Sequence, residues 1–259
     1  NRENNFLASV HFDRKMAGVA FLDISTGEFL TAQGNIEYID KLLSSFQPKE
    51  VLFQRGRSQE FQEIFGTKYY TYNLEDWVYT EDAAFDRLTR HFQVKSLKGF
   101  GIHELPLGII AAGAVLHYLD LTQHRQIQHI SQIGRIEEEH YVWLDRFTIR
   151  NLELFSSIHE GAKTLLNVID RTISPMGSRM LRRWIALPLK EAVPINERLD
   201  VVESFTRDES LKENLEEHLR QIGDLERLIS KVAVGRINPR EVVQIKNALN
   251  AILPIKQAC

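Results

Sequence analysis

Cysteine is almost absent from this chain, which has one among its 259 residues, Cys259. A single cysteine excludes an internal disulfide framework and any metal site built from several cysteines. This composition suits a reducing compartment, and we expect a cytoplasmic protein.

Long hydrophobic runs and a strong charge of either sign are also lacking. The longest apolar run, 107–116, is too short to cross a bilayer, and no signal peptide is visible, so we expect no membrane association. The formal net charge is -3, whereas a general nucleic-acid binder would be strongly basic. The composition, 43% hydrophobic and 26% charged, is typical of a globular protein with one large core or two ordinary ones.

Short strands and helices alternate in the first half of the chain. Three β-rich runs separated by polar turns predict a meander, and Gly27 supplies a positive φ in the second turn. Strands and helices then follow in turn. The strands are expected at 6–10, 17–24, 28–31, 51–53 and 68–72, and the helices at 36–46, 61–65, 80–92 and 106–119. This order predicts an α/β domain over residues 1–126.

Two of these helices carry further expectations. In helix 80–92 we expect Phe85, Leu88 and Phe92 to point inward. The helix that Pro106 opens contains small residues at Gly108 and at several later positions, so it can lie close against a sheet.

The second half of the chain is helical in period. Residues 127–144 are interpreted as linking strands, and residues 145–259 as an all-α domain. Ser174 can cap a helix whose first residue is Pro175. The run 238–241, Asn-Pro-Arg-Glu, predicts another helix start with an Asn cap and a Glu at the third position. The chain begins at Asn1 rather than Met and stops just after a helix, so we expect a piece of a longer protein.

The helix from Pro175 to Pro188 has two contrasting sides. Its apolar stripe predicts a core centred on Trp184 and Met180, in which Trp184→Ala would cost about 3–5 kcal/mol. Its other side is basic, at Arg179, Arg182 and Arg183. Two interpretations stay open for these arginines: a solvated helix face, or a patch that contacts nucleic-acid phosphates. From Arg171 to Lys190 there are five basic residues and no acid.

Familiar catalytic motifs are incomplete in this chain. The run 161–164, Gly-Ala-Lys-Thr, lacks the glycines of a phosphate loop, so Gly161 is interpreted as a turn. The run 99–101, Gly-Phe-Gly, lacks the third glycine of a dinucleotide fingerprint. His117 and His124 lie two turns apart on one predicted helix, too far to share a metal alone.

One catalytic alternative comes from the strand order. A meander followed by alternating helices and strands resembles the ribonuclease H-like topology, whose nucleases gather acidic residues around two metal ions. The candidate ligands are Asp13, Asp23, Glu28 and Asp145. Asp13 and Asp23 are interpreted as turn residues, and Asp145 lies beyond the α/β domain.

Three ordered motifs resemble one family. The run 173–189, ISPMGSRMLRRWIALPL, resembles the core-domain signature of MutS, the bacterial DNA mismatch-recognition ATPases, and 144–154 resembles the entry to that core. The run 224–228 followed by 238–241 is similar to a later motif. The first domain, with LDISTG at 22–27 and 99–101, resembles the connector domain of the family.

This resemblance implies a ribonuclease H-like connector domain followed by the first part of a helical core, or lever, domain. It implies that the mismatch-reading, DNA-clamp and ATPase domains lie outside this segment, which then has no catalysis and holds no cofactor. The parent would be a homodimer that binds ATP, Mg and mismatched DNA. The segment would couple DNA binding to the distant ATPase while binding DNA weakly or not at all.

The resemblance also implies a docking face for the partner protein MutL on the connector domain. The helix of residues 80–93 matches part of that face, and its expected outward positions are Asp86 and Arg87. A plain solvated helix is the alternative for these two positions.

Overall fold

A computed structural model describes residues 2–124, 126–157, 159 and 161–258, so Cys259 lies outside the described residues. The chain divides into two compact units. Residues 5–137 form the first, here called the α/β unit. Residues 138–259, joined by the first four residues of the chain, form the second, here called the helical unit. Mixed strands and helices in one unit and helices in the other agree with the expected α/β domain followed by an all-α domain.

The α/β unit ends at residue 137, later in the chain than the predicted end at residue 126. Strand β6 (Gly134–Arg135) pairs in parallel with β3 and so belongs to the sheet of the α/β unit. Ile130 and Ile133 before it are 1% and 3% exposed, which fixes this segment against the same core. The expected linking strands 127–144 therefore divide between the units, with Tyr141 bridging to Leu189 inside the helical unit.

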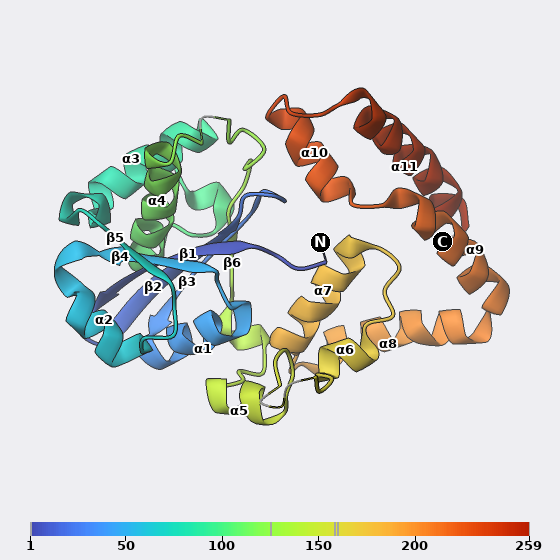
Figure 1. Ribbon diagram of the computed structural model, residues 1–259, viewed down its shortest axis with the longest axis horizontal. Helices are drawn as coiled ribbons and strands as arrows, with labels where there is room; N and C mark the ends of the chain where they lie inside the picture. The colour runs from blue at the N-terminus through green and yellow to red at the C-terminus, as the bar shows by residue number, and fades with distance from the viewer. Residues whose placement is uncertain (1, 125, 158, 160, 259) are drawn as a thin grey trace. The chain divides into compact units, whose positions relative to one another are not determined.

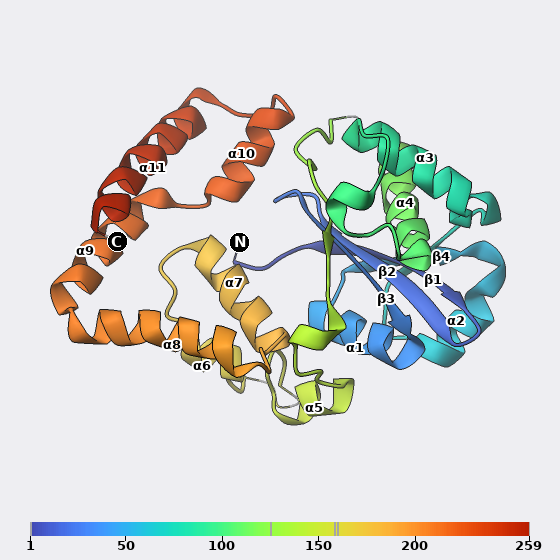
Figure 2. The ribbon, with the colours of Figure 1, turned by 180° about the vertical axis from the view of Figure 1, so that it is seen from behind.

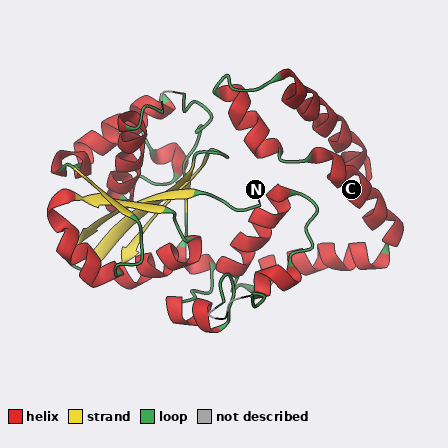
Figure 3. Cartoon of the chain, viewed as in Figure 1, coloured by secondary structure: helices red, strands yellow, loops and turns green. Residues whose placement is uncertain are grey.

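The α/β unit is built on one six-stranded sheet, shown in Figure 1 and coloured yellow in Figure 3. The strand order is β5-β4-β1-β2-β3-β6, with β1, β2 and β3 antiparallel and the other strands parallel to their neighbours. The strands are β1 (Phe6–Asp13), β2 (Met16–Asp23), β3 (Glu28–Asn35), β4 (Glu50–Gln54) and β5 (Thr71–Leu74), with β6 as given above. The predicted meander is confirmed.

Helices cover both faces of this sheet, as the opposite views in Figures 1 and 2 show. They are α1 (Ile36–Phe46), α2 (Ser58–Phe65), α3 (Glu81–Phe92) and α4 (Pro106–Leu121). Phe21 of β2 stacks on Phe46 of α1 at 4.3 Å between ring centroids, whereas the neighbouring Ala20 and Leu22 belong to the core under α4. The alternation of side chains along each strand therefore supplies two apolar faces.

Inside α3 the buried face differs from the expected one. Ala84 and Leu88 are fully buried, but Phe85 is 39% exposed. The Cα of Ala84 would lie 2.5 Å from a Cβ added at Gly113, so α3 and α4 approach along a small-residue contact. Ala84 takes the central position of that contact, and Phe85 is displaced to its flank.

The helical unit contains the remaining helices. They are α5 (Arg146–Asn151), α6 (Leu165–Ile169), α7 (Pro175–Ala186), α8 (Ala192–Arg207), α9 (Glu209–Ile222), α10 (Leu225–Ala233) and α11 (Pro239–Ala258). Among the described residues, no helix is both long enough and apolar enough to cross a membrane.

Local caps set the predicted helix starts. The Ser174 hydroxyl accepts the Gly177 N–H at 3.1 Å ahead of Pro175. The Asn238 side chain accepts the Glu241 N–H, and the Glu241 carboxylate accepts the Asn238 N–H, both at 3.0 Å. Both helix starts are confirmed, and the second is a reciprocal capping box.

The expected core around Trp184 is wrong. In α7, Trp184 is 42% and Met180 is 55% exposed, and Pro175 is half-buried, whereas Arg179 is only 4% exposed. The cause is a set of carboxylates that receives the Arg179 guanidinium and turns the basic side of the helix inward. Trp184 is covered on one ring face by the Arg198 guanidinium at 3.8 Å, so the large loss expected for Trp184→Ala does not apply.

We predict that Gly18→Ala destabilises the α/β unit by about 1–3 kcal/mol, the usual cost of overpacking a core. A Cβ at Gly18 would lie 2.1–2.3 Å from backbone atoms of Leu107 and Gly108 at the start of α4. Thermal or urea unfolding of the chain measures the loss. Gly99→Ala is the matched control, because a Cβ there meets nothing within 4 Å. Equal stability of the two variants would contradict the close approach of α4.

Candidate functional site

The basic side of α7 meets the start of α10 through Arg179. Its guanidinium donates from Nη1 to Asp224 Oδ2 at 2.9 Å and from Nη2 to Asp224 Oδ1 at 2.7 Å. Nη2 also donates to Glu226 Oε2 at 2.5 Å. A bidentate, charge-assisted pair of this kind has the directional geometry that arginine favours. Arg179 with Asp224 and Glu226 is called the α7–α10 joint below.

Asp224 serves both partners of this joint. It is the N-cap residue of α10, where its carboxylate accepts the Arg227 N–H at 3.4 Å. A carboxylate at a helix N-terminus is favoured by the exposed N–H groups and by the helix dipole. The same carboxylate therefore starts α10 and holds α7, so neither helix can shift here without breaking a charged contact.

The ionisation of these groups reflects the pairing. Burial alone lowers the pKa of Arg179, but the hydrogen bonds to Asp224 and Glu226 outweigh it and raise that pKa. Burial raises the pKa of Asp224, but the hydrogen bond and the charge of Arg179 outweigh it and lower that pKa. Both groups therefore stay charged across the physiological pH range.

The other two arginines of α7 also face the interior of the helical unit. Arg182 lies 4.4 Å above the Phe155 ring and 3.9 Å from Glu3 Oε1. Burial lowers the pKa of Arg182 and of Arg183, and the charge of Glu226 opposes this for Arg183. The structure therefore does not present Arg179, Arg182 and Arg183 as one solvated basic face.

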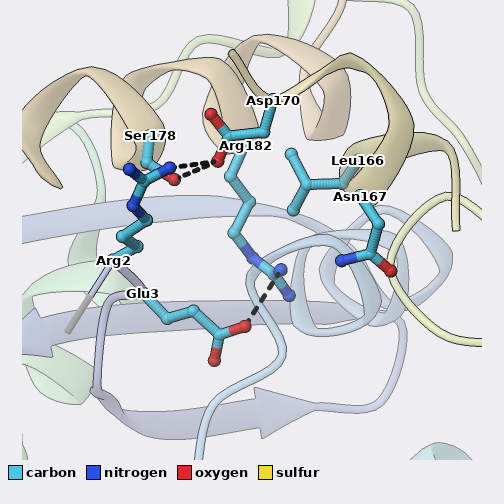
Figure 4. Close-up of a pocket in the computed structure, with 7 residues that line it drawn as sticks. All are labelled: Arg2, Glu3, Leu166, Asn167, Asp170, Ser178 and Arg182. Carbon is cyan, nitrogen blue, oxygen red and sulfur yellow. Dashed lines mark hydrogen bonds and ion pairs between the residues drawn. The ribbon is translucent and has the colours of Figure 1, made fainter. Parts of the chain in front are cut away.

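A polar cavity of about 290 Å³ lies next to Arg182 in the helical unit, as drawn in Figure 4. Its walls carry two arginines and two carboxylates among other groups: Arg2, Glu3, Leu166, Asn167, Asp170, Ser178 and Arg182. Asp170 accepts from Ser178 Oγ at 2.5 Å and lies 3.7 Å from Arg2 Nη1. Because cations and carboxylates alternate around it, the cavity has no surplus charge to select an ion.

The four candidate metal ligands are not brought together. In the register of β1 and β2, Asp13 pairs with Met16 and Asp23 pairs with Phe6, so the two carboxylates stand at opposite ends of the hairpin. At about 3.3 Å per residue they are about 23 Å apart. Within the described ranges, no group of three His, Cys, Asp or Glu residues is placed to hold a metal ion.

Asp23 and Asp145 each have a local structural task, and Asp13 is the last residue of β1. Asp23 Oδ1 accepts Ser25 N–H at 2.9 Å, and its carbonyl accepts Gly27 N–H at 2.9 Å, where Gly27 has a φ of 78°. This confirms the predicted turn. Glu28 is the first residue of β3, beside Asp23 in the sheet. Asp145 caps α5 by accepting the Thr148 N–H at 2.7 Å.

The two positions expected on the docking face differ in exposure. Asp86 is exposed on α3. The Arg87 side chain is only 20% exposed, with Nε 3.9 Å from Asp120 of α4 and the guanidinium 5.9 Å from the Trp77 ring centroid. Arg87 is therefore wrong as an outward position, because it helps to attach α3 to α4.

The remaining look-alike motifs are turns and single contacts. Gly161 has a φ of 77° and Gly101 one of 69°, as turn glycines do. The His117 ring packs edge-on against Trp77, and His124 Nδ1 lies 2.9 Å from the Thr122 hydroxyl. Helix α4 ends at Leu121, so the two histidines do not share a helix as expected.

The sequence analysis did not predict the carboxylates that pair with the arginines of α7. They come from Glu3 and from the start of α10, respectively far before and after the arginines along the chain. One signal was available, because a helix with several arginines and no acid of its own has to find counter-charges elsewhere or stay in water.

We predict that Arg179→Ala destabilises the helical unit by about 2–3 kcal/mol. Removing one partner of a buried ion pair costs about 3–5 kcal/mol, and the half-exposed Glu226 lowers that figure here. Thermal unfolding measures the loss. The control is Arg207→Ala, since Arg207 and Glu203 form an exposed pair on α8 worth about 1 kcal/mol or less. A similar small loss in both variants would show that the joint contributes little.

Comparison with known proteins agrees with these two units. A family model for MutS domain II matches residues 5–131, and one for MutS domain III matches residues 147–259. The chain is 61% identical over 258 residues to the DNA mismatch repair protein MutS of Bacteroides thetaiotaomicron. It is 60% identical over 259 residues to that of Parabacteroides distasonis and 57% identical over 257 residues to that of Flavobacterium psychrophilum.

These alignments cover 99–100% of the chain and 30% of each relative. The chain thus spans 30% of the length of the curated relatives that it matches. The two domain models match in the order II and then III, and the gap between them contains the boundary of the two units. The matches therefore support a single family for the whole chain. The chain belongs to the MutS family of DNA mismatch repair proteins and carries its domains II and III.

Proposed function

We propose that this chain couples mismatched-DNA binding in the full-length protein to a distant ATPase, and performs no catalysis itself. The observation that carries the proposal is the α7–α10 joint, in which Arg179 is 4% exposed and bound to two carboxylates. A relay needs elements that move together, and a bidentate buried ion pair makes two helices move as one.

The chain path supports the same role. The α/β unit begins and ends on the helical unit, because residues before 5 and after 137 both belong to the latter. A unit attached by two chain segments has fewer ways to move than one on a single linker. Such an attachment suits a domain that changes position in a defined direction.

We further propose that the α/β unit is a ribonuclease H-like connector domain without nuclease activity. The order β5-β4-β1-β2-β3, with the first three strands in sequence antiparallel, supports this topology. The separation of Asp13 from Asp23 speaks against a two-metal site on the sheet, since such sites hold their ions about 4 Å apart.

The parent protein, in this proposal, is a cytoplasmic homodimer that binds ATP, Mg and mismatched DNA through its other domains and recruits MutL. The alternative, phosphate binding by Arg179, Arg182 and Arg183, has less support because their charges face carboxylates of the same unit. A short duplex titrated at increasing salt distinguishes them: phosphate binding gives an affinity that falls steeply with salt.

We predict that Arg179→Lys in the full-length protein weakens the stimulation of ATP turnover by mismatched DNA by about five-fold, the lower end of typical coupling. Lysine keeps the charge but cannot make the bidentate contact with Asp224. Basal ATP turnover and DNA affinity without nucleotide should stay unchanged. Full stimulation in this variant, at unchanged stability, would refute the relay.

We predict that Asp86→Lys lowers the affinity for MutL by about five-fold, as expected for one charge at an interface. Asp86 is exposed on α3, so its reversal leaves the fold intact. Glu63→Lys is the control, because Glu63 is an exposed acid on α2. The affinity for MutL is measured with both variants of the full-length protein. Equal affinities of the two variants would show that α3 is not part of the docking face.

A further inference from the structure

The first described residues of the chain form a short strap on the helical unit. Arg2 Nη1 lies 3.7 Å from Asp170 Oδ2, and Glu3 Oε1 lies 3.9 Å from Arg182 Nη1. The carbonyl oxygen of Glu3 accepts a hydrogen bond from Arg227 Nη2 at 2.7 Å. Residues 2–4, called the strap below, are thus held by side chains of α7, of α10 and of the segment before α7.

The strap and the α7–α10 joint share one network of charges. Arg227, which holds the Glu3 carbonyl, lies 3.8 Å from Asp224 Oδ2 through its Nε. Asp224 is the carboxylate that binds Arg179 in a bidentate manner. An unbroken chain of contacts therefore runs from Arg179 through Asp224 and Arg227 to Glu3.

The strap continues directly into strand β1 of the α/β unit. Asn5 N–H donates to Asp23 Oδ2 at 3.2 Å, which anchors the start of β1 inside that unit. Only Asn4 separates this anchor from the Glu3 carbonyl. One residue spans at most about 3.6 Å, so a shift of the strap of more than a few ångströms has to move β1 or break a contact.

The ion pairs of the strap, unlike the hydrogen bond to the Glu3 carbonyl, are individually weak. The Arg182 and Arg227 side chains are each 18% exposed, the Glu3 side chain is 58% exposed, and the Glu3–Arg182 separation of 3.9 Å is long. Partly exposed ion pairs of this kind stabilise little by themselves.

We propose that Glu3, Arg182 and Arg227 are positioning residues that transmit movement of the α7–α10 joint to strand β1 through the strap. This inference rests on the proposed relay function and adds the route by which the relay reaches the α/β unit. It assigns the pairing of Glu3 with Arg182 a role in coupling, beyond filling the wall of the cavity in Figure 4.

A charge exchange in the full-length protein tests the route. Glu3→Arg and Arg182→Glu each place like charges together, and we expect each to lower the stimulation of ATP turnover by mismatched DNA by about five-fold. The two substitutions combined restore an opposite pair and should return the stimulation to within about two-fold of the original. Glu3→Gln removes the charge with little change of shape and should also lower the stimulation. This variant remains informative if the two charge reversals fail to fold.

The control is the same exchange at an exposed pair of the helical unit. Glu203→Arg with Arg207→Glu reverses an ion pair on α8 outside the network, and neither the single nor the combined variants should change the stimulation. Basal ATP turnover and thermal unfolding are measured for all variants. A strap that is only structural would change the unfolding temperature without a coupling defect that the combined variant repairs.

The outcomes separate the two proposals. If Arg179→Lys weakens stimulation but the Glu3 and Arg182 variants do not, or if their combination fails to restore it, the strap route is overturned and the relay stands. If none of these variants affects stimulation, the relay itself fails. Loss in both single variants with recovery in the combined one supports the route.

Discussion

The buried guanidinium of Arg179 is the constraint on which the helical unit depends. A charge that is 4% exposed requires full compensation, and here two carboxylates of the α10 start supply it. This requirement fixes which side of α7 faces inward, and it leaves Trp184 and Met180 exposed. Asp224 therefore has two partners, the Arg227 N–H of α10 and the Arg179 guanidinium of α7. Both contacts fix the position at which α10 begins.

The two units are therefore stabilised in different ways. The α/β unit has apolar cores on both faces of its sheet, and Gly18 and Gly108 allow α4 to lie directly on the strands. One apolar cluster of the helical unit is small, with Ile222, Ala248 and Ala251 buried, while α7 and α10 are joined by charges. Close-packed cores resist small displacements in the α/β unit. In the helical unit the buried pair of Arg179 and Asp224 has the corresponding role, because α7 and α10 cannot separate without exposing a charge that has lost its partner.

Local rules made much of this structure predictable from the sequence. The turn at Gly27, the caps at Ser174 and Asn238 and the small residues of α4 depend on a few neighbouring residues, and all are found where expected. Which side of α7 is buried depends instead on the contact of Arg179 with Asp224, 45 residues away. The prediction from the apolar stripe of α7 therefore placed the wrong side of the helix inward. The end of the α/β unit was misplaced because β6 has two residues and pairs with a distant strand. The charges of Asp86 and Arg87 are evident from the sequence, but the burial of Arg87 depends on its contacts with Asp120 of α4 and with the Trp77 ring.

The missing counter-charges point to a more general way to interpret such a helix. Arginines on a solvated helix commonly have acids three or four positions away, but the segment from Arg171 to Lys190 has five basic residues and no acid. Two of these residues, Arg179 and Arg182, find their carboxylates in Glu3, Asp224 and Glu226, which belong to segments before and after α7. Charges that can be neutralised only by distant segments tie those segments to one helix. A helix with this composition is therefore suited to join parts of a protein that must move together, which is the property that a relay requires.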